Sequence, residues 1–539
     1  MADLATLVEA IPSRPSLVPR KTRARSSRSG IAAFLIALVG GVGYIGVHVA
    51  KDLNNVTVTS VWPYLLLALA LLIALGFEFV NGFHDTANAV ATVIYTNSLE
   101  PNVAVVLSGL CNLAGVLASS GTVAYAVITL LPVELILQVS SGSGFAMVFA
   151  LLIAAILWNL GTWWVGLPAS SSHSMVGSII GVGVANQLLS VHTGTSGVDW
   201  DQAIKVLKVL LISPVVGFGA AALLMLISKF MVRYPSLYEA PKNNEPPPFP
   251  IRALMVLTCT GVSFFHGSND GQKGMGLIML ILIGTVPTAY ALNHAVTAQD
   301  IQEYIAASEQ AGQILDRHVD KRGILGADAR AEVTDYIRTK QLQPDTILAL
   351  RELVEDLNHE VALYKMFKSV PAQDQPNVRN DMYVASEAIR LMQKSHNPAF
   401  TPQENAVLAN YKAKVDKATK FIPDWVKVAV ALALGLGTMV GWKRIVVTVG
   451  EKIGKDHLTY AQGAAAGMVA MGTIWAADTF GLPVSTTHVL SSGVAGTMVA
   501  NGSGVRLSTV RNIAAGWVFT LPAAGLLSGL LYWLFRTVS

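Results

Sequence analysis

The chain has 539 residues, of which 52% are hydrophobic and only 13% are charged, and its formal net charge is +4. This composition lies outside the range of ordinary soluble domains and predicts a polytopic membrane protein. It also excludes a zinc motif or disulfide framework, because the only two cysteines, Cys111 and Cys259, stand far apart in apolar sequence. Basic residues cluster in loops and near the N-terminus, where membrane topology explains them without a nucleic-acid partner.

The N-terminal part of the chain predicts a tail followed by an extra helix. Residues 1–30 contain several Ser, Pro and Arg residues and are expected to form a disordered basic tail. An apolar run of membrane length follows at residues 31–50, and no small-residue cleavage site stands out. We therefore expect an uncleaved transmembrane helix, with the tail on the cytoplasmic side, rather than a signal peptide.

The rest of the chain alternates long apolar runs with short polar loops. Since about 20 apolar residues span a bilayer, we expect an all-α protein with roughly ten to twelve spanning or re-entrant segments. Prolines within these runs predict helix breaks at Pro101, Pro132, Pro168 and Pro214. The predicted divisions are a first repeat at 61–228, a cytoplasmic loop with several Lys and Arg at 229–252, the start of a second repeat at 253–293 and its remainder at 421–539.

Residues 294–420 interrupt the second repeat. They hold 34 of the chain's 72 charged residues. From Asp345 to Phe367, apolar residues recur at three- and four-residue spacing, which is typical of an amphipathic helix. We expect a soluble helical insertion on the cytoplasmic side, either an elaboration without chemistry or a regulatory or partner-binding module.

Two motifs occur twice, which divides the chain into related halves. The string GLPASSSH at 166–173 returns as GLPVSTTH at 481–488, 315 residues later. The string GFHD at 82–85 has a counterpart, GSND, at 267–270, at an offset of 185 residues. The difference between the two offsets matches the length of the predicted insertion to within a few residues.

The first duplicated motif predicts an anion site. Pro168 and Pro483 each precede three hydroxyl residues and a fresh apolar run, so each marks a helix start within the membrane. A helix N-terminus offers free N–H groups and a partial positive charge, and the hydroxyls add donors. The alternative is an ordinary helix cap, but two copies favour a built site for a tetrahedral oxyanion. Its candidate ligands are Ser170, Ser171, Ser172, Ser485, Thr486 and Thr487.

The second duplicated motif places a carboxylate, Asp85 or Asp270, in apolar sequence in each half. A carboxylate at bilayer depth needs a partner or a cation, and two carboxylates beside an oxyanion require imported positive charge. The pattern therefore favours a coupling cation. Asn88 and Lys273, each three residues further on, are expected on the same helical faces, and the alternative for Asp270 is a simple ion pair with Lys273.

Histidines stand beside both motifs and can carry protons near neutral pH. They are His84, His266, His173 and His488, and the alternative for each is a hydrogen-bonded core residue. Glu78 and Asp478 flank the motifs without acidic counterparts in the other half, and we treat them as secondary candidates. The pattern gives no certain metal site, no catalytic residue and no cofactor.

At these residues the chain resembles the inorganic phosphate transporter (PiT) family, and it looks closest to the bacterial low-affinity Pit members. The strings that carry the resemblance are SFFHGSNDGQKG (263–274), WNLGTW (158–163), GWKR (441–444) and residues 481–491. The resemblance implies two inverted repeats with re-entrant hairpins, phosphate held by the hairpin hydroxyls, and a coupling cation near the paired aspartates. By motif position it also implies that Asn88 and Asn269 lie at the phosphate or ion site, with Gln272 and Lys273 as weaker candidates.

Two positions depart from the family pattern. The family commonly has Ala-Asn where this chain has Phe83 and His84, which changes the surroundings of Asp85. Sodium-coupled animal members place a glutamate where this chain has Asn112, which removes one sodium ligand and favours protons.

Together these features predict a proton-coupled symporter of inorganic phosphate, carried free or as a metal–phosphate complex, in the cell inner membrane. Sodium-coupled transport of phosphate, or transport of another oxyanion such as sulfate, is the alternative. A phosphate sensor that has lost transport is a third reading. An intramembrane hydrolase using Ser172 and His173, or Thr487 and His488, is disfavoured because adjacent helical residues point about 100° apart. The expected partners are phosphate, the cation and the lipid bilayer, and the sequence leaves a homo-oligomer open.

Overall fold

A computed structural model describes residues 28–53, 62–137, 142–190, 197–241, 246–320, 328–371 and 373–538. The predicted basic tail at 1–30 lies almost entirely outside these residues. Within them the fold is helical, as predicted, and the only β-pairing is an isolated bridge between Gly454 and Val505.

The helices that precede the predicted insertion are α2 (Arg28–Leu53), α3 (Trp62–Tyr95), α4 (Pro101–Ala118), α5 (Thr122–Ile128), α6 (Val133–Leu137), α7 (Gly142–Trp164), α8 (Ser171–Leu189), α9 (Trp200–Met231), the short η2 (Pro235–Leu237), α10 (Phe249–Thr285) and α11 (Pro287–Tyr290). Those of residues 294–420 are α12 (Ala298–His318), α13 (Ala329–Thr339), α14 (Thr346–Tyr364), η3 (Phe367–Ser369), α15 (Gln375–Ser395) and α16 (Pro402–Thr419). The chain ends with α17 (Asp424–Thr438), α18 (Lys443–Val447), the π-helical turn η4 (Thr448–Lys452), α19 (Tyr460–Thr479), α20 (Thr486–Asn501) and α21 (Leu507–Val538).

Only some of the described helices are long and apolar enough to cross a bilayer. The described residues hold seven such helices, or eight if α16 and α17, which meet at a bend of 73°, count as one broken span. The seven are α2, α3, α4, α7, α9, α10 and α21. The predicted ten to twelve segments included re-entrant ones, and the hairpin arms α8, α19 and α20 are not among the seven.

One predicted helix break is wrong. Pro214 lies inside α9, which continues from Trp200 to Met231. A proline removes the hydrogen bond to the carbonyl four residues earlier, here that of Leu210. The Ser213 hydroxyl donates to this carbonyl at 2.8 Å and replaces the missing bond. Hydroxyl side chains commonly satisfy backbone groups freed by proline in apolar helices, so α9 stays continuous.

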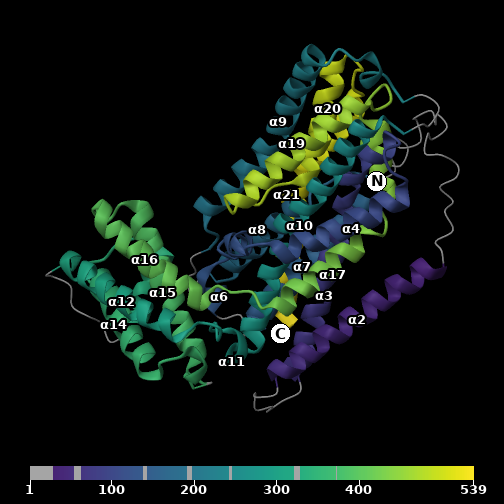
Figure 1. The fold of residues 1–539 in the computed structure, drawn as a ribbon. Helices are drawn as coiled ribbons and strands as arrows, with labels where there is room; N and C mark the ends of the chain where they lie inside the picture. The colour runs from purple at the N-terminus through teal and green to yellow at the C-terminus, as the bar shows by residue number, and fades with distance from the viewer. Residues whose placement is uncertain are drawn as a thin grey trace.

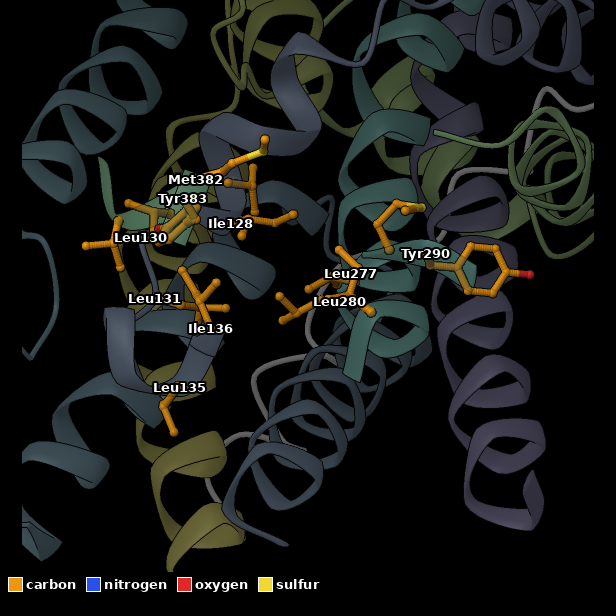
Figure 2. Close-up of a cluster of buried hydrophobic side chains, with 14 of the residues drawn as sticks. Ile128, Leu130, Leu131, Leu135, Ile136, Leu277, Leu280, Tyr290, Met382 and Tyr383 are labelled. Atoms are coloured by element: carbon orange, nitrogen blue, oxygen red, sulfur yellow. The ribbon is translucent and has the colours of Figure 1, made fainter. Parts of the chain in front are cut away.

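The helices of residues 294–420 pack against each other beside the long helices (Figure 1). Their apolar faces share a core with the membrane helices rather than forming a separate one. Figure 2 shows Met382 and Tyr383 of α15 beside Ile128 and Leu130, at the end of α5 and just after it. The helices of residues 294–420 therefore pack on the rest of the protein through apolar side chains.

Helices of one half pack against helices of the other in a reciprocal pattern. Helix α3 packs along α17 while α10 packs along α4, and α8 packs along α21 while α20 packs along α9. Glycines allow the closest of these contacts: a Cβ on Gly82 would lie 2.2 Å from Leu434 O, and one on the equivalent Gly267 would lie 2.1 Å from Asn112 O. Equivalent glycines thus make equivalent contacts, as expected of duplicated halves. The inverted orientation of the halves and the domain boundaries stay predictions.

Candidate functional site

The first hairpin turn joins α7 to α8 through a glycine in the left-handed region. Gly166 has a φ of 69°. Its N–H donates to Trp163 O at 2.9 Å, and the N–H of Leu167 donates to Thr162 O at 2.9 Å. This pair of bonds is a Schellman motif, which ends a helix cleanly and favours glycine because other residues are strained there.

The second hairpin turn, between α19 and α20, repeats this geometry. Gly481 has a φ of 63°, its N–H donates to Asp478 O at 3.0 Å, and the N–H of Leu482 donates to Ala477 O at 2.8 Å. Both copies of the duplicated motif therefore reverse the chain in the same way. Each new helix begins three residues after the proline, at Ser171 and at Thr486.

The three hydroxyl side chains at each helix start make different contacts. Ser170 and Ser485 are N-caps: their side chains accept from the N–H groups of His173 at 3.3 Å and His488 at 3.2 Å. The ordinary capping interpretation therefore holds for the first hydroxyl of each set. The second and third hydroxyls are left for other contacts, and all six are buried.

The two hairpins converge on one carboxylate, that of Asp85 in α3. The Ser171 hydroxyl makes a short hydrogen bond to Asp85 Oδ2, and the Thr487 hydroxyl donates to Asp85 Oδ1 at 2.7 Å. His84 Nδ1 lies 3.1 Å from the same Oδ1, and its Nε2 lies 3.2 Å from the hydroxyl of Thr162 at the end of α7. His84, one of the residues that depart from the family pattern, thus contacts Asp85 directly.

Asn88 and Lys273 occupy equivalent positions and make equivalent contacts. Asn88 Nδ2 donates to Thr487 Oγ1 at 2.8 Å, and Lys273 Nζ donates to Ser172 Oγ at 2.5 Å. Each therefore binds the third hydroxyl of the hairpin that belongs to the other half. Lys273 also forms an ion pair with Asp270 at 2.5 Å, so the simple alternative for Asp270 is present alongside the hairpin contact.

His266 lies between the two aspartates. Its Nε2 is 3.6 Å from Asp270 Oδ2 and 4.0 Å from Asp85 Oδ2, while its Nδ1 is 2.8 Å from Asn112 Oδ1. The ligand atoms of Asp85, His266 and Asp270 lie within 4.8 Å of one another, and all three residues are buried. Such a group can hold a cation or a shared proton.

Sequence reasoning noted His266 but missed its central place, and it missed Asn81 altogether. Asn81 Oδ1 accepts from the Ser171 hydroxyl at 2.6 Å. Asn81 and His266 are equivalent positions, four residues before Asp85 and Asp270. A search one helical turn before each carboxylate would have found both, because residues four apart share a helix face.

Asn269 and Gln272 hold the second hairpin turn. Asn269 Nδ2 donates to Leu482 O at 3.0 Å. Gln272 Nε2 donates to Asp478 Oδ1 at 2.9 Å, and its Oε1 accepts from the N–H of Val123 at 2.9 Å. Asp478 is therefore tied to the turn, and these amides position the hairpin.

The remaining candidates lie at the edge of the cluster. The rings of His173 and His488 face each other with centroids 4.3 Å apart, and His488 stacks on Trp517 at 4.2 Å. Neither ring is bonded to Asp85 or Asp270 in the described part of the chain. Glu78 is fully buried, and Asn81 Nδ2 donates to its Oε2 at a long 3.5 Å, while its Oε1 has no hydrogen-bond partner among the described residues.

The two residue pairs of the hydrolase alternative, Ser172 with His173 and Thr487 with His488, are not joined by hydrogen bonds in the described part of the chain. Ser172 Oγ donates to Val484 O at 3.0 Å, and Thr487 Oγ1 donates to Asp85. No hydrogen bond joins either hydroxyl to the neighbouring His173 or His488 within the described residues.

Comparison with known proteins gives the family. Residues 81–528 match the phosphate transporter family. The chain belongs to the phosphate transporter family. This membership agrees with the resemblance carried by the sequence motifs. The chain is therefore a multi-pass membrane protein, and its family consists of transporters rather than enzymes.

Relatives in this family are similar over nearly their whole length. The low-affinity inorganic phosphate transporter PitA of Escherichia coli K12 is 42% identical over 489 residues, which cover 87% of this chain and 96% of the relative. PitB of the same organism is 40% identical over 498 residues, covering 89% and 99%. A probable low-affinity inorganic phosphate transporter of Bacillus subtilis is 26% identical over 478 residues, covering 88% and 99%.

A solved structure, described as the sodium-dependent phosphate transporter, aligns with 88% of this chain and 100% of its own. Its sequence identity is 18% and the TM-score is 0.47.

Proposed function

We propose that this protein carries inorganic phosphate across the cell inner membrane by symport with protons. The observation that supports this most is the convergence of the two hairpins: Ser171 from one and Thr487 from the other both bind Asp85. The substrate is inferred from the names of the relatives, and coupling to protons is inferred from the arrangement of charges and hydroxyls. The tail and residues 294–420 would face the cytoplasm.

Phosphate fits the chemistry of the hairpin ends. Two helix N-termini carry partial positive charge, and Lys273 adds a full one beside Ser172. Thr486 Oγ1 is buried and has no hydrogen-bond partner among the described residues. A buried hydroxyl without a partner costs free energy, which a bound oxyanion would recover by accepting from it.

The charges near the hairpins explain why transport would need a cation. Asp85 and Asp270 outweigh Lys273 by one negative charge, and a phosphate ion adds further negative charge. Burying this sum in a membrane interior is unfavourable unless cations or protons enter with the substrate. The charges of the site therefore support coupling of phosphate transport to a cation.

Protons suit this arrangement better than sodium. The group between the two carboxylates is an imidazole, that of His266, and a second one, that of His84, contacts Asp85. Imidazole titrates near neutral pH, whereas hard cations prefer shells made of oxygen. The Ser171 hydroxyl has one hydrogen but faces two acceptors, Asn81 Oδ1 and Asp85 Oδ2, and a proton on Asp85 would resolve that conflict.

A divalent metal travelling with phosphate is the second way to supply positive charge. Two carboxylates and one imidazole form a donor set that suits zinc or manganese. In that case Asp85, His266 and Asp270 would contact the metal, and the hairpin hydroxyls would contact the phosphate. The metal would be cargo rather than a resident cofactor.

Uptake into liposomes tests the proposal. Labelled phosphate uptake is measured under an imposed inward proton gradient, with and without sodium, for the wild type, Asp85→Asn and Asp270→Asn. We expect uptake that follows the proton gradient, ignores sodium and disappears in both variants. A requirement for sodium would overturn proton coupling but keep the substrate. Phosphate binding without any uptake would overturn transport and favour a sensor.

A further inference from the structure

A basic cavity lies where residues 294–420 meet the membrane helices, beside the turn of the second hairpin. Its volume is about 560 Å³. One wall comes from residues 120–129, at and after the start of α5, and the other from the end of α16 and the start of α17. Three lysines line it, Lys417, Lys420 and Lys427, together with one acid, Asp416. Lys417 is paired with Asp300 at 2.6 Å, which leaves Lys420 and Lys427 with Asp416.

The positive charge of this cavity is only partly neutralised. Asp416 is shared by two lysines, with Lys412 at 2.6 Å and Lys420 at 2.8 Å. Lys427 donates to the backbone carbonyl of Ser119 at 3.3 Å, and no carboxylate lies within 4 Å of its Nζ among the described residues. One of the two lysines that share Asp416 therefore lacks a carboxylate of its own within the described ranges, and so does Lys427.

A buried arginine, Arg379, carries a further positive charge close enough to interact with Tyr125 of the cavity lining. The side chain of Arg379 in α15 is 6% exposed, and its Nε has no hydrogen-bond partner in the described part of the chain. Its guanidinium stacks on Tyr383 at 5.2 Å and donates to Asn380 at 3.1 Å, and no carboxylate lies within 4 Å in the same residues. Burial lowers the pKa of Arg379. The charge acts electrostatically on Tyr125, which lines the cavity.

We propose that this cavity binds a phosphate group, as a second oxyanion site distinct from the hairpins. A cavity lined by ammonium groups and hydroxyls matches the donors that recognise phosphate, and the nearby guanidinium of Arg379 has no carboxylate partner among the described residues. An uncompensated buried cation is costly, and a bound oxyanion would lower that cost. The phosphate group is that of free inorganic phosphate or of an anionic lipid headgroup, because both carry the same recognised oxygens.

The cavity adjoins the second hairpin through one residue. A Cβ on Gly481, in the hairpin turn, would lie 3.4 Å from Thr122, which lines the cavity. The next residue, Val123, donates its N–H to Gln272, which in turn holds Asp478. An oxyanion in the cavity would therefore sit against the elements that position Ser485, Thr486 and Thr487.

Binding measurements on the full chain in nanodiscs of zwitterionic lipid test the site independently of transport. Labelled phosphate bound per chain is compared for the wild type, Lys427→Gln, Lys427→Arg and Lys368→Gln. Lys368 is exposed and lies outside the cavity, so it serves as the matched control. We expect Lys427→Gln to weaken phosphate binding at one site by about tenfold, as loss of a charge-assisted hydrogen bond predicts. Lys427→Arg and Lys368→Gln should leave it unchanged.

The second arm separates the two sources of the phosphate group. The same proteins are placed in nanodiscs that contain phosphatidylglycerol, and retained lipid is measured by native mass spectrometry. Retention by the wild type and Lys427→Arg, but not by Lys427→Gln, would identify a lipid headgroup as the occupant. Arg379→Gln should behave as Lys427→Gln does in whichever arm responds. If Lys427→Gln equals Lys368→Gln in both arms, the second site does not exist.

Discussion

Replacement of Gly267 by alanine should destabilise the protein and disturb the site together. A Cβ at this position would lie 2.1 Å from Asn112 O in α4, and this carbonyl belongs to a helix backbone that cannot rotate away. Overpacking of this kind costs about 1–3 kcal/mol or more, which exceeds the roughly 1 kcal/mol that alanine gains over glycine in a helix. We expect a net loss of about 2 kcal/mol in the free energy of unfolding.

The consequence for the site follows from what α4 carries. The Asn112 side chain contacts His266 Nδ1 at 2.8 Å, so a shift of α4 moves the imidazole that lies between the two aspartates. Phosphate uptake should therefore fall in Gly267→Ala even at temperatures where the variant stays folded.

Gly472→Ala is the matched control, because a Cβ there meets nothing within 4 Å. Alanine should leave that position unchanged or stabilise it by up to about 1 kcal/mol. Thermal unfolding in detergent, followed by size-exclusion chromatography, compares the two variants, and uptake in liposomes is measured alongside. If Gly267→Ala unfolds at the same temperature as Gly472→Ala, the close contact between α4 and α10 is not as tight as described.

Three further predictions test the site and its surroundings. Thr487→Val removes the hydrogen bonds to Asp85 and Asn88 and should cost about 1–3 kcal/mol of stability. Thr486→Val breaks no bond among the described residues, so it should leave stability unchanged but weaken phosphate binding. Equal losses of stability in thermal unfolding would contradict these different roles of the two hydroxyls. Glu78→Gln should fold normally, because the carboxyl lacks a cationic partner within 4 Å in the described residues. As a buried carboxyl at membrane depth, Glu78 is also a candidate proton carrier, so the variant should reduce proton-driven accumulation of phosphate in liposomes; unchanged accumulation would show that Glu78 takes no part in coupling. Arg390→Gln breaks two ion pairs, with Glu387 in α15 and, at 3.1 Å, with Asp199 at the start of α9. It should lower stability by about 0.5–1 kcal/mol, and the difference from wild type should shrink at high salt; a difference that does not change with salt would show that packing, not charge, is lost.

Local features of the fold could be predicted from the sequence, because they depend on residues close together in the chain. The proline of each duplicated motif predicts a new helix start, and α8 and α20 begin three residues after it. The reversal of the chain at Gly166 and Gly481 is implied only by the resemblance to the family. Pro214 misled the prediction because the compensating contact comes from the adjacent Ser213, whose effect a proline rule does not include.

The contacts across the site could not be predicted, because they join residues hundreds of positions apart. Nothing in the sequence shows that Thr487 reaches Asp85, or that His266 lies between both aspartates. The resemblance to a family supplied candidate ligands by position, but not which hydroxyl caps a helix and which one faces a carboxylate. That distinction required the geometry of both hairpins.

The reciprocal packing of the two halves has a consequence for biosynthesis. Helix α3 leaves the ribosome long before its partner α17, and the whole of residues 294–420 is synthesised in between. Helix α8 waits for a comparable time, because its partner α21 begins only at Leu507. During this interval Asp85 lacks its bond from Thr487, and Ser172 lacks its acceptor Val484 O, both in the second hairpin. The nascent first half must therefore be sheltered by lipid or by the insertion machinery, and a chain that stops before residue 507 would leave α8 without its partner.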